Sequence, residues 1–232
     1  MAAWPWTEGT LAPMLIRPDG ESFLCIGQAS HAWISGQMAR AWAEPFEPHE
    51  EVCLAAEQHD VGMAEWDLAP SLNPETGLPM TFTEMPFEVH SALWLAAPRK
   101  LVTTSAYAAA LVSLHGTRLY ELREPTPKVV SFLEWQEAFR RWLGFERPGL
   151  EPGSTLVWIW DYLSLAVLLG WVGEAEGYSV DGLRVTPWPF RSPTLRVRYE
   201  ARRLGERFAE EGKMRAALAR APAETFELEL TS

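Results

Sequence analysis

The sequence predicts a mainly α-helical protein, in which a helical core is flanked by a small β-sheet built from both ends of the chain (α+β overall). Apolar residues recur at helical spacing through most of residues 28–170, whereas strand-like runs lie within 11–27 and 180–232. The chain has 232 residues, of which 47% are hydrophobic and 22% charged, so it can bury a core of its own. No linker divides it, and we expect a single domain over 1–232.

The first elements are expected to be a hairpin and two helices. Residues 14–28 contain two short apolar runs separated by the sequence Pro-Asp-Gly at 18–20, which is typical of a turn. Ser30 can cap a helix that runs to about Trp42, and a second helix is expected over roughly 50–66.

A proline-rich loop follows over residues 67–86. A loop of this length inside one domain is often functional, so this segment is a candidate lid over a site. The alternative is a surface loop with no role in function.

More helices are expected in the second half of the core. Pro86 can occupy the first turn of a helix that carries His90, because proline is favoured there. Ser131 and Glu134 form a capping box at the start of another helix. The helix over 154–170 is apolar on nearly every side and should lie at the centre. The remaining expectations are helices over 105–122, 131–144 and near 202–220, with strands at 195–200 and 226–231.

The charge of the chain argues against two classes of partner. The formal net charge is -11 and there is no basic run, so a nucleic-acid backbone or an anionic membrane surface is not expected as a partner. A small anionic substrate remains compatible, because a bound cation can reverse the local sign of charge. The oligomeric state is left open.

Nothing in the sequence predicts export or a membrane span. The first ten residues lack the basic and apolar regions of a signal peptide. The longest apolar run, 155–171, is shorter than the roughly 20 residues of a membrane span and contains Asp161. Cys25 and Cys53 show no disulfide or metal-binding spacing, and we expect both to be reduced and buried. A cytoplasmic protein is therefore expected.

The feature that points to function is a set of histidines and aspartates on the predicted buried faces of helices. A single buried histidine is more often a satisfied core residue than a ligand. Here four of the five histidines lie on such faces, and the exception, His49, lies in a polar run. Burying so many polar groups is costly unless something neutralises them, and metal ions would do so. The set comprises His31, His59, Asp60, His90, His115 and Asp161.

The order of these residues along the chain resembles that of the HD-domain superfamily of metal-dependent phosphohydrolases. The resemblance covers about residues 28–170 and also extends to the HD-type mixed-valent di-iron oxygenases. Locally, "HDVGMAEWD", "FTEMPFEVH", "LVSLHGTRLY" and "WDYLSL" resemble an uncharacterised bacterial family of unknown function.

The resemblance implies two divalent metal ions, of iron, manganese, magnesium or zinc. His31, His59, Asp60 and Asp161 would hold one ion. Asp60 would bridge to a second ion, completed by His90 and His115.

Two catalytic functions and one non-catalytic function fit this pattern. The first is hydrolysis of a small phosphoester or nucleotide-like substrate, because two ions about 3.5–4 Å apart can activate a water and stabilise the displaced oxygens. Asp60 and Arg118 are the catalytic candidates, and Arg118 can also bind a phosphate, as can Arg40, Lys100 and Gln37 more weakly. The second is oxygenation by a di-iron pair. The third is a metal-stabilised sensor without catalysis.

Overall fold

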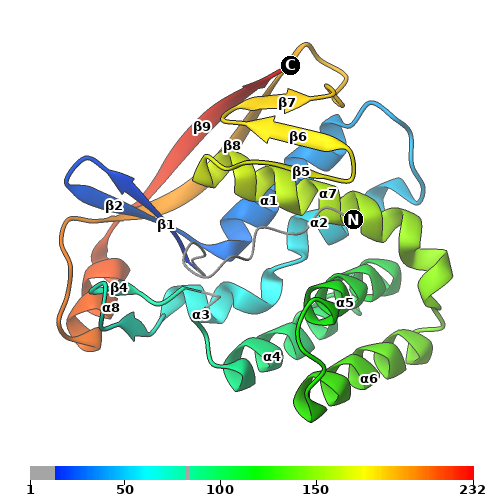
Figure 1. The fold of residues 1–232 in the computed structure, drawn as a ribbon, viewed down its shortest axis with the longest axis horizontal. Helices are drawn as coiled ribbons and strands as arrows, with labels where there is room; N and C mark the ends of the chain where they lie inside the picture. The colour runs from blue at the N-terminus through cyan, green and yellow to red at the C-terminus, as the bar shows by residue number, and fades with distance from the viewer. Residues whose placement is uncertain (1–13, 82–83) are drawn as a thin grey trace.

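The computed structural model describes residues 14–81 and 84–232, and its main elements are a curved sheet and a group of helices (Figure 1). The helices are α1 (Gln28–Ala41), α2 (His49–Gln58), α3 (Ala64–Leu68), α4 (Phe87–Ala96), α5 (Ala106–Glu121), α6 (Pro127–Trp142), α7 (Arg147–Leu169) and α8 (Glu211–Arg220), with 3-10 turns at Val61–Met63 and Pro98–Lys100. The strands are β1 (Leu15–Asp19), β2 (Ser22–Ile26), β3 (Leu72–Asn73), β4 (Leu78–Pro79), β5 (Val172–Ala175), β6 (Tyr178–Asp181), β7 (Arg184–Thr186), β8 (Thr194–Leu204) and β9 (Ala223–Thr231).

The sheet has seven strands in the order β1-β2-β8-β9-β7-β6-β5. All neighbouring pairs are antiparallel except β7 and β9, which run parallel and meet at Arg184 and Thr231. The strands β3 and β4 form a separate pair within the loop expected over 67–86. Residues 82–83 of that loop lie outside the described residues, and its role as a lid stays a prediction.

The prediction of a mainly α-helical protein with an HD-domain-like core was wrong. The structure is 51% helix and 22% strand, and its large mixed sheet makes it an α/β fold. The strands β5, β6 and β7 are too short to show a clear alternation in sequence. Their turns carry the signal that could have revealed them, Glu-Gly at 176–177 and Asp-Gly at 181–182, because Glu176 and Gly177 both take the positive φ of a tight hairpin turn.

The helix expected over 50–66 is interrupted close to the His59-Asp60 pair. It ends at Gln58, and a 3-10 turn and the short α3 follow. The interruption lies where the chain packs tightly against α4, since a Cβ atom on Gly62 would lie 2.3 Å from the carbonyl oxygen of Leu93. A continuous helix was expected because the apolar periodicity does not register this close approach.

The helix α1 is fastened to the unpaired edge of β8. The strand β2 pairs with β8 only at its end, from Arg202 to Leu204. Further along the same strand, Gln37 exchanges hydrogen bonds with the backbone of Arg198, at 2.8 and 2.9 Å. Ser30 does the same with the backbone of Glu200, at 2.9 and 2.7 Å. These side chains satisfy backbone groups that a neighbouring strand would otherwise pair, and they fix the position of α1.

The helix α7 lies in the core, as its apolar sequence predicts. Trp160 and Leu163 are fully buried, and the Trp160 ring packs edge-on against Trp42, the residue that follows α1. The helix is long and apolar enough to cross a membrane by length and composition, but 78% of that apolar window is buried inside the protein.

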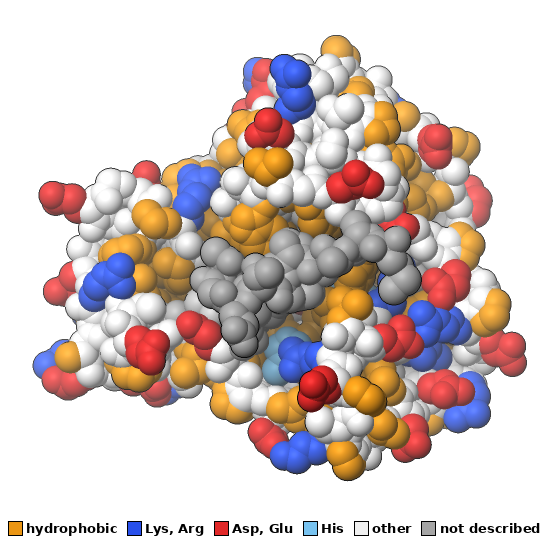
Figure 2. All heavy atoms as spheres, viewed as in Figure 1, with side chains coloured by type: hydrophobic (Ala, Val, Ile, Leu, Met, Phe, Trp, Pro, Cys, Tyr) orange, Lys and Arg blue, Asp and Glu red, His pale blue; other side chains and the backbone are white. Residues whose placement is uncertain are grey.

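Acidic and basic side chains are interspersed over the described part of the face seen in Figure 2, where hydrophobic side chains gather in the middle.

Candidate metal centre

Four parts of the chain bring five of the six predicted ligands together in the interior. His31 comes from α1, His59 and Asp60 from the turn after α2, His115 from α5, and Asp161 from α7. All five are buried, with no more than 7% of any residue exposed. The local sequence explains their positions, because each lies on the buried face of its helix or at the break beside Gly62.

The nitrogen and oxygen atoms of this cluster lie close to one another. The Nε2 atom of His31 is 2.6 Å from an oxygen of Asp60 and 3.7 Å from Oδ1 of Asp161. The Nε2 atom of His59 is 3.3 Å from the same Asp161 oxygen, and that of His115 is 3.3 Å from the other, Oδ2. Asp161 therefore contacts three imidazoles with its two oxygens.

A metal ion could be held by His31, His59 and Asp161. One ligand atom from each of these three residues lies within 4.8 Å of the others, and all three residues are buried. Three protein ligands that leave a coordination position open are typical of catalytic zinc sites, whereas structural sites use four. The set mixes nitrogen and oxygen and therefore does not select one metal.

Hydrogen bonds outside the cluster orient two of the imidazoles. The Nδ1 atom of His59 donates to the carbonyl oxygen of Ala56 at 2.8 Å. The Nδ1 atom of His31 lies 2.9 Å from the hydroxyl of Ser164, whose own hydrogen is donated to the carbonyl of Asp161. Such partners on the far ring nitrogen are usual for metal-binding histidines. Ser164 was not among the residues predicted from the sequence, although it lies one helical turn from Asp161 and so on the same face.

These bonds leave an electrostatic mismatch at the centre of the cluster. With Nδ1 acting as the donor, a neutral imidazole presents a lone pair at Nε2. In His31 this atom can hydrogen-bond to Asp60 at 2.6 Å only if it carries a proton, and in His59 it faces Asp161 at 3.3 Å and is buried without a hydrogen bond among the described residues. A proton on each Nε2 or a shared cation would resolve the mismatch. The donor set therefore fits a divalent ion.

The pKa values in the cluster depend on two opposing effects, burial and the charges of neighbouring histidines and aspartates. Burial lowers the pKa of His59, but the carboxylates of Asp60 and Asp161 outweigh it and raise the value to about 9. Burial raises the pKa of Asp161, yet its histidine neighbours, His59 foremost, hold it well below the usual range. Asp60 is lowered in the same way, against the effect of burial. For His115 burial prevails and the pKa is lowered.

The sixth predicted ligand, His90, has a different set of partners. Its Nδ1 atom lies 2.6 Å from the hydroxyl of Tyr120, and its Nε2 accepts a hydrogen bond from the indole of Trp94 at 3.3 Å. Burial and the nearby Arg123 lower its pKa to about 3, so the ring is neutral. The ring of Trp94 also lies 5.6 Å from that of His115, which makes His90 a neighbour of the cluster through aromatic contacts.

Arg118 lies one turn beyond His115 on α5. Its guanidinium stacks over the ring of Trp158 at 4.7 Å, and that ring lies 5.5 Å from the ring of His115. One terminal nitrogen of Arg118 is 3.3 Å from Glu176, whereas the other, Nη1, is buried without a hydrogen-bond partner in the described chain. Arg118 therefore carries an unused donor, and the ring of Trp158 lies between its guanidinium and His115.

The other three predicted substrate-binding residues have partners elsewhere. Arg40 forms an ion pair with Glu57 at 2.5 Å, and Lys100 forms one with Glu65 at 3.2 Å. Gln37 binds the edge of β8. The structure does not bring these three side chains into the contacts of the cluster, and their assignment to a substrate stays a prediction.

Comparison with known proteins identifies a family. A family model described as "Protein of unknown function (DUF3891)" matches residues 14–206. The chain belongs to this family. No curated protein and no solved structure matches it. The prediction of membership in the HD-domain superfamily was wrong, because the matching family is a different one and because the seven-stranded sheet is not part of a purely helical HD core.

Proposed function

We propose that this DUF3891 protein is a metal-dependent hydrolase of a small phosphoester or nucleotide-like substrate. The observation that carries the proposal is the buried group of His31, His59 and Asp161, with the unused donor of Arg118 close by. A ligand group for a cation beside a free guanidinium N–H suits a substrate whose anionic oxygens must be bound from two sides.

The proposed division of roles follows the contacts. His31, His59 and Asp161 hold a divalent ion, which when bound supplies Lewis acidity and lowers the pKa of a water. Asp60, whose carboxylate contacts His31, completes the ligands or accepts a proton from the attacking water. Arg118 binds an oxygen of the phosphoester.

A second ion, if bound, would be held by Asp161 and His115. The two oxygens of Asp161 face different imidazoles, Oδ1 toward His31 and His59 and Oδ2 toward His115. Asp161 could therefore be a ligand of both ions, a role that the sequence pattern assigned to Asp60. His90 could join only by releasing the hydrogen bond from Trp94.

Metal analysis of protein purified without added metal tests the centre directly. We expect one or two divalent ions per chain in the natural protein and a loss of metal in His59→Ala. The matched control is His49→Ala, since His49 is the one histidine that was not predicted to be a ligand and its side chain is partly exposed. Metal-free natural protein, or the same metal content in both variants, would refute the metal centre.

Turnover of bis-p-nitrophenyl phosphate by the metal-loaded protein tests the chemistry. We expect hydrolysis that is lost in Asp161→Asn, and a raised KM in Arg118→Gln. Arg141→Gln, an exposed arginine on α6, should leave both constants unchanged. Two iron ions with a mixed-valent electron paramagnetic signal and no phosphoesterase activity would favour oxygenation. Bound metal without any turnover would favour a sensor.

A further inference from the structure

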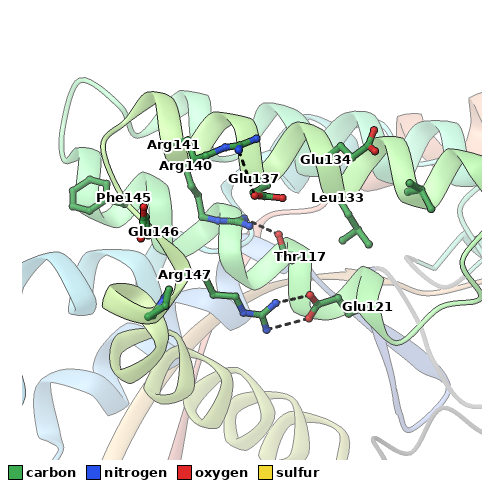
Figure 3. A pocket seen from close by; sticks show the side chains of 12 residues that line it. Thr117, Glu121, Leu133, Glu134, Glu137, Arg140, Arg141, Phe145, Glu146 and Arg147 are labelled. Atoms are coloured by element: carbon green, nitrogen blue, oxygen red, sulfur yellow. Dashed lines mark hydrogen bonds and ion pairs between the residues drawn. The ribbon is translucent and has the colours of Figure 1, made fainter.

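A pocket lies between α5, α6 and the start of α7, away from the metal centre. Its volume is about 530 Å³, and none of the proposed ligands lines it. Figure 3 shows Arg140 reaching from α6 toward Thr117 on α5, and Arg147 directed toward Glu121. An apolar part of the wall is formed by Val130, Leu133, Phe145 and Pro148.

Arg140 is a buried cation without a carboxylate partner among the described residues. It is only 4% exposed, and its Nη1 atom donates to the hydroxyls of Ser113 at 3.0 Å and Thr117 at 2.7 Å. Both hydroxyl hydrogens are used elsewhere, Ser113 donating to Gln136 and Thr117 to the carbonyl of Ser113. The other guanidinium nitrogens have no hydrogen bond to the described chain, and Arg140 is one of the residues that line the pocket.

Burial of a charge without a counter-charge is costly, and the pKa of Arg140 is accordingly lowered to about 10 by burial and by Arg147. A positively charged side chain held by neutral hydroxyls at the wall of a cavity is suited to bind an anion from solution.

The remaining charges of the pocket restrict which anion fits. Arg147 is paired with Glu121 and Glu151, and Arg141 lies 3.7 Å from Glu137. Two other lining residues, Glu134 and Glu146, have no ion pair within the described part of the chain. The unpaired charges are therefore one cation and two anions. A polyanion would be repelled by the glutamates, whereas a molecule with one negative and one positive group matches both.

We propose that this pocket binds a small zwitterion of the amino-acid type, with its carboxylate on Arg140 and its amino group beside Glu134 or Glu146. The apolar body of the molecule lies against the wall formed by Leu133 and Phe145. The proposal uses none of the residues of the metal centre and stands independently of the proposed hydrolase.

Calorimetric titration of the full chain with L-leucine and L-phenylalanine tests the proposal. Isovalerate, which lacks the amino group, isopentylamine, which lacks the carboxylate, and inorganic phosphate are the comparison ligands. We expect an amino acid to bind more tightly than any of the three. Arg140→Gln should weaken it by about two orders of magnitude, because a buried charge pair is lost. Arg141→Gln, which changes a paired and exposed arginine of the same pocket, should bind as the natural protein does.

A second pair of variants keeps the test valid if Arg140→Gln does not fold. Glu134 and Glu146 are exposed, so Glu134→Gln together with Glu146→Gln should fold normally. This double variant should bind leucine more weakly than the natural protein does, but its affinity for isovalerate should not fall. Absence of binding by both amino acids, or unchanged binding in Arg140→Gln, overturns the proposal. If phosphate or isovalerate binds as tightly as leucine, the pocket is a site for anions in general, and the proposal that it binds a zwitterion is wrong.

Discussion

Two buried polar clusters lie on opposite sides of α5 and carry opposite excess charge. His115 belongs to the buried cluster of the candidate metal centre, where two carboxylates face three imidazoles. Ser113 and Thr117, one turn apart on the other side of the helix, accept from Arg140. The same helix thus separates a cluster rich in acceptors from a cluster with a lone cation.

The difference shows how a buried polar group can indicate its missing partner. In the candidate metal centre His31 and His59 direct Nε2 at carboxylate oxygens, an arrangement that a proton or a cation would stabilise. At Arg140 hydroxyl oxygens satisfy hydrogen bonds but supply no charge, an arrangement that an anion would stabilise. In both places the hydrogen bonds within the described chain do not balance the buried charge.

The largest effect is expected at Asp161, the carboxylate that contacts three imidazoles in the proposed metal centre. Asp161→Asn keeps the shape of the side chain but removes the charge that faces three imidazoles. Metal affinity should fall by at least about a hundredfold, more than is typical for residues that only support a ligand. Competition with a metal-binding dye measures this. Asp181→Asn, at an exposed aspartate of β6, is the control, and an equal affinity in both variants would contradict the prediction.

A smaller effect is expected where α1 joins the sheet. The double variant Ser30→Ala, Gln37→Leu removes four hydrogen bonds to the backbone of β8. Because water can replace some of them, the free energy of unfolding should fall by about 1–3 kcal/mol, measured in urea. The variant should also weaken metal binding, since α1 carries His31, but leave the Arg140 pocket unchanged. Equal losses at both sites would show that the two clusters are not independent.

The free energy of unfolding should depend on pH through Asp67, a residue outside both clusters. Asp67 receives a hydrogen bond from the first backbone N–H of α1, and burial raises its pKa from 3.8 to about 8. The folded state therefore holds a proton that the unfolded state releases between these values. The contribution of Asp67 to the free energy of unfolding is therefore greatest below about pH 4. It is lost as the pH rises toward 8.

Asp67→Asn should flatten this dependence. The slope that it removes cannot exceed about 1.4 kcal/mol per pH unit, and urea unfolding at several pH values measures it. Arg140 should contribute no slope in this range, because its pKa, about 10, lies above it. An identical pH profile in natural protein and Asp67→Asn would refute the assignment.

The smallest effect on stability is expected at Arg140. Arg140→Met removes a buried charge that has only hydroxyl partners, and the hydroxyls of Ser113 and Thr117 keep acceptors of their own. Replacing a buried charge by an apolar side chain is often neutral or favourable, so unfolding in urea should change by within about 1 kcal/mol. A loss of several kcal/mol would mean that Arg140 serves the fold rather than a ligand.

Local periodicity predicted much of the helical part. The helices that carry His31, His90, His115 and Asp161 were expected close to their observed positions, because burial of one face leaves a pattern within a single helix. The pocket around Arg140 was not foreseen. Ser113 and Thr117 look in sequence like ordinary polar residues of a helix, and only the packing of α6 on α5 brings a guanidinium to them.

The sequence by itself determined most of the helical segments and which histidines are buried, since both depend on neighbours within a few residues, whereas the break after Gln58 and the start of α8 at Glu211 were not predicted. The tertiary structure alone decided the seven-stranded sheet, the attachment of α1 to β8, and the convergence of His31, His59 and Asp161. These features join residues far apart in the chain, and periodicity records that a face is buried without recording what lies against it. The orientation of each imidazole likewise depends on partners such as Ala56 and Ser164, which are selected only once the helices have packed.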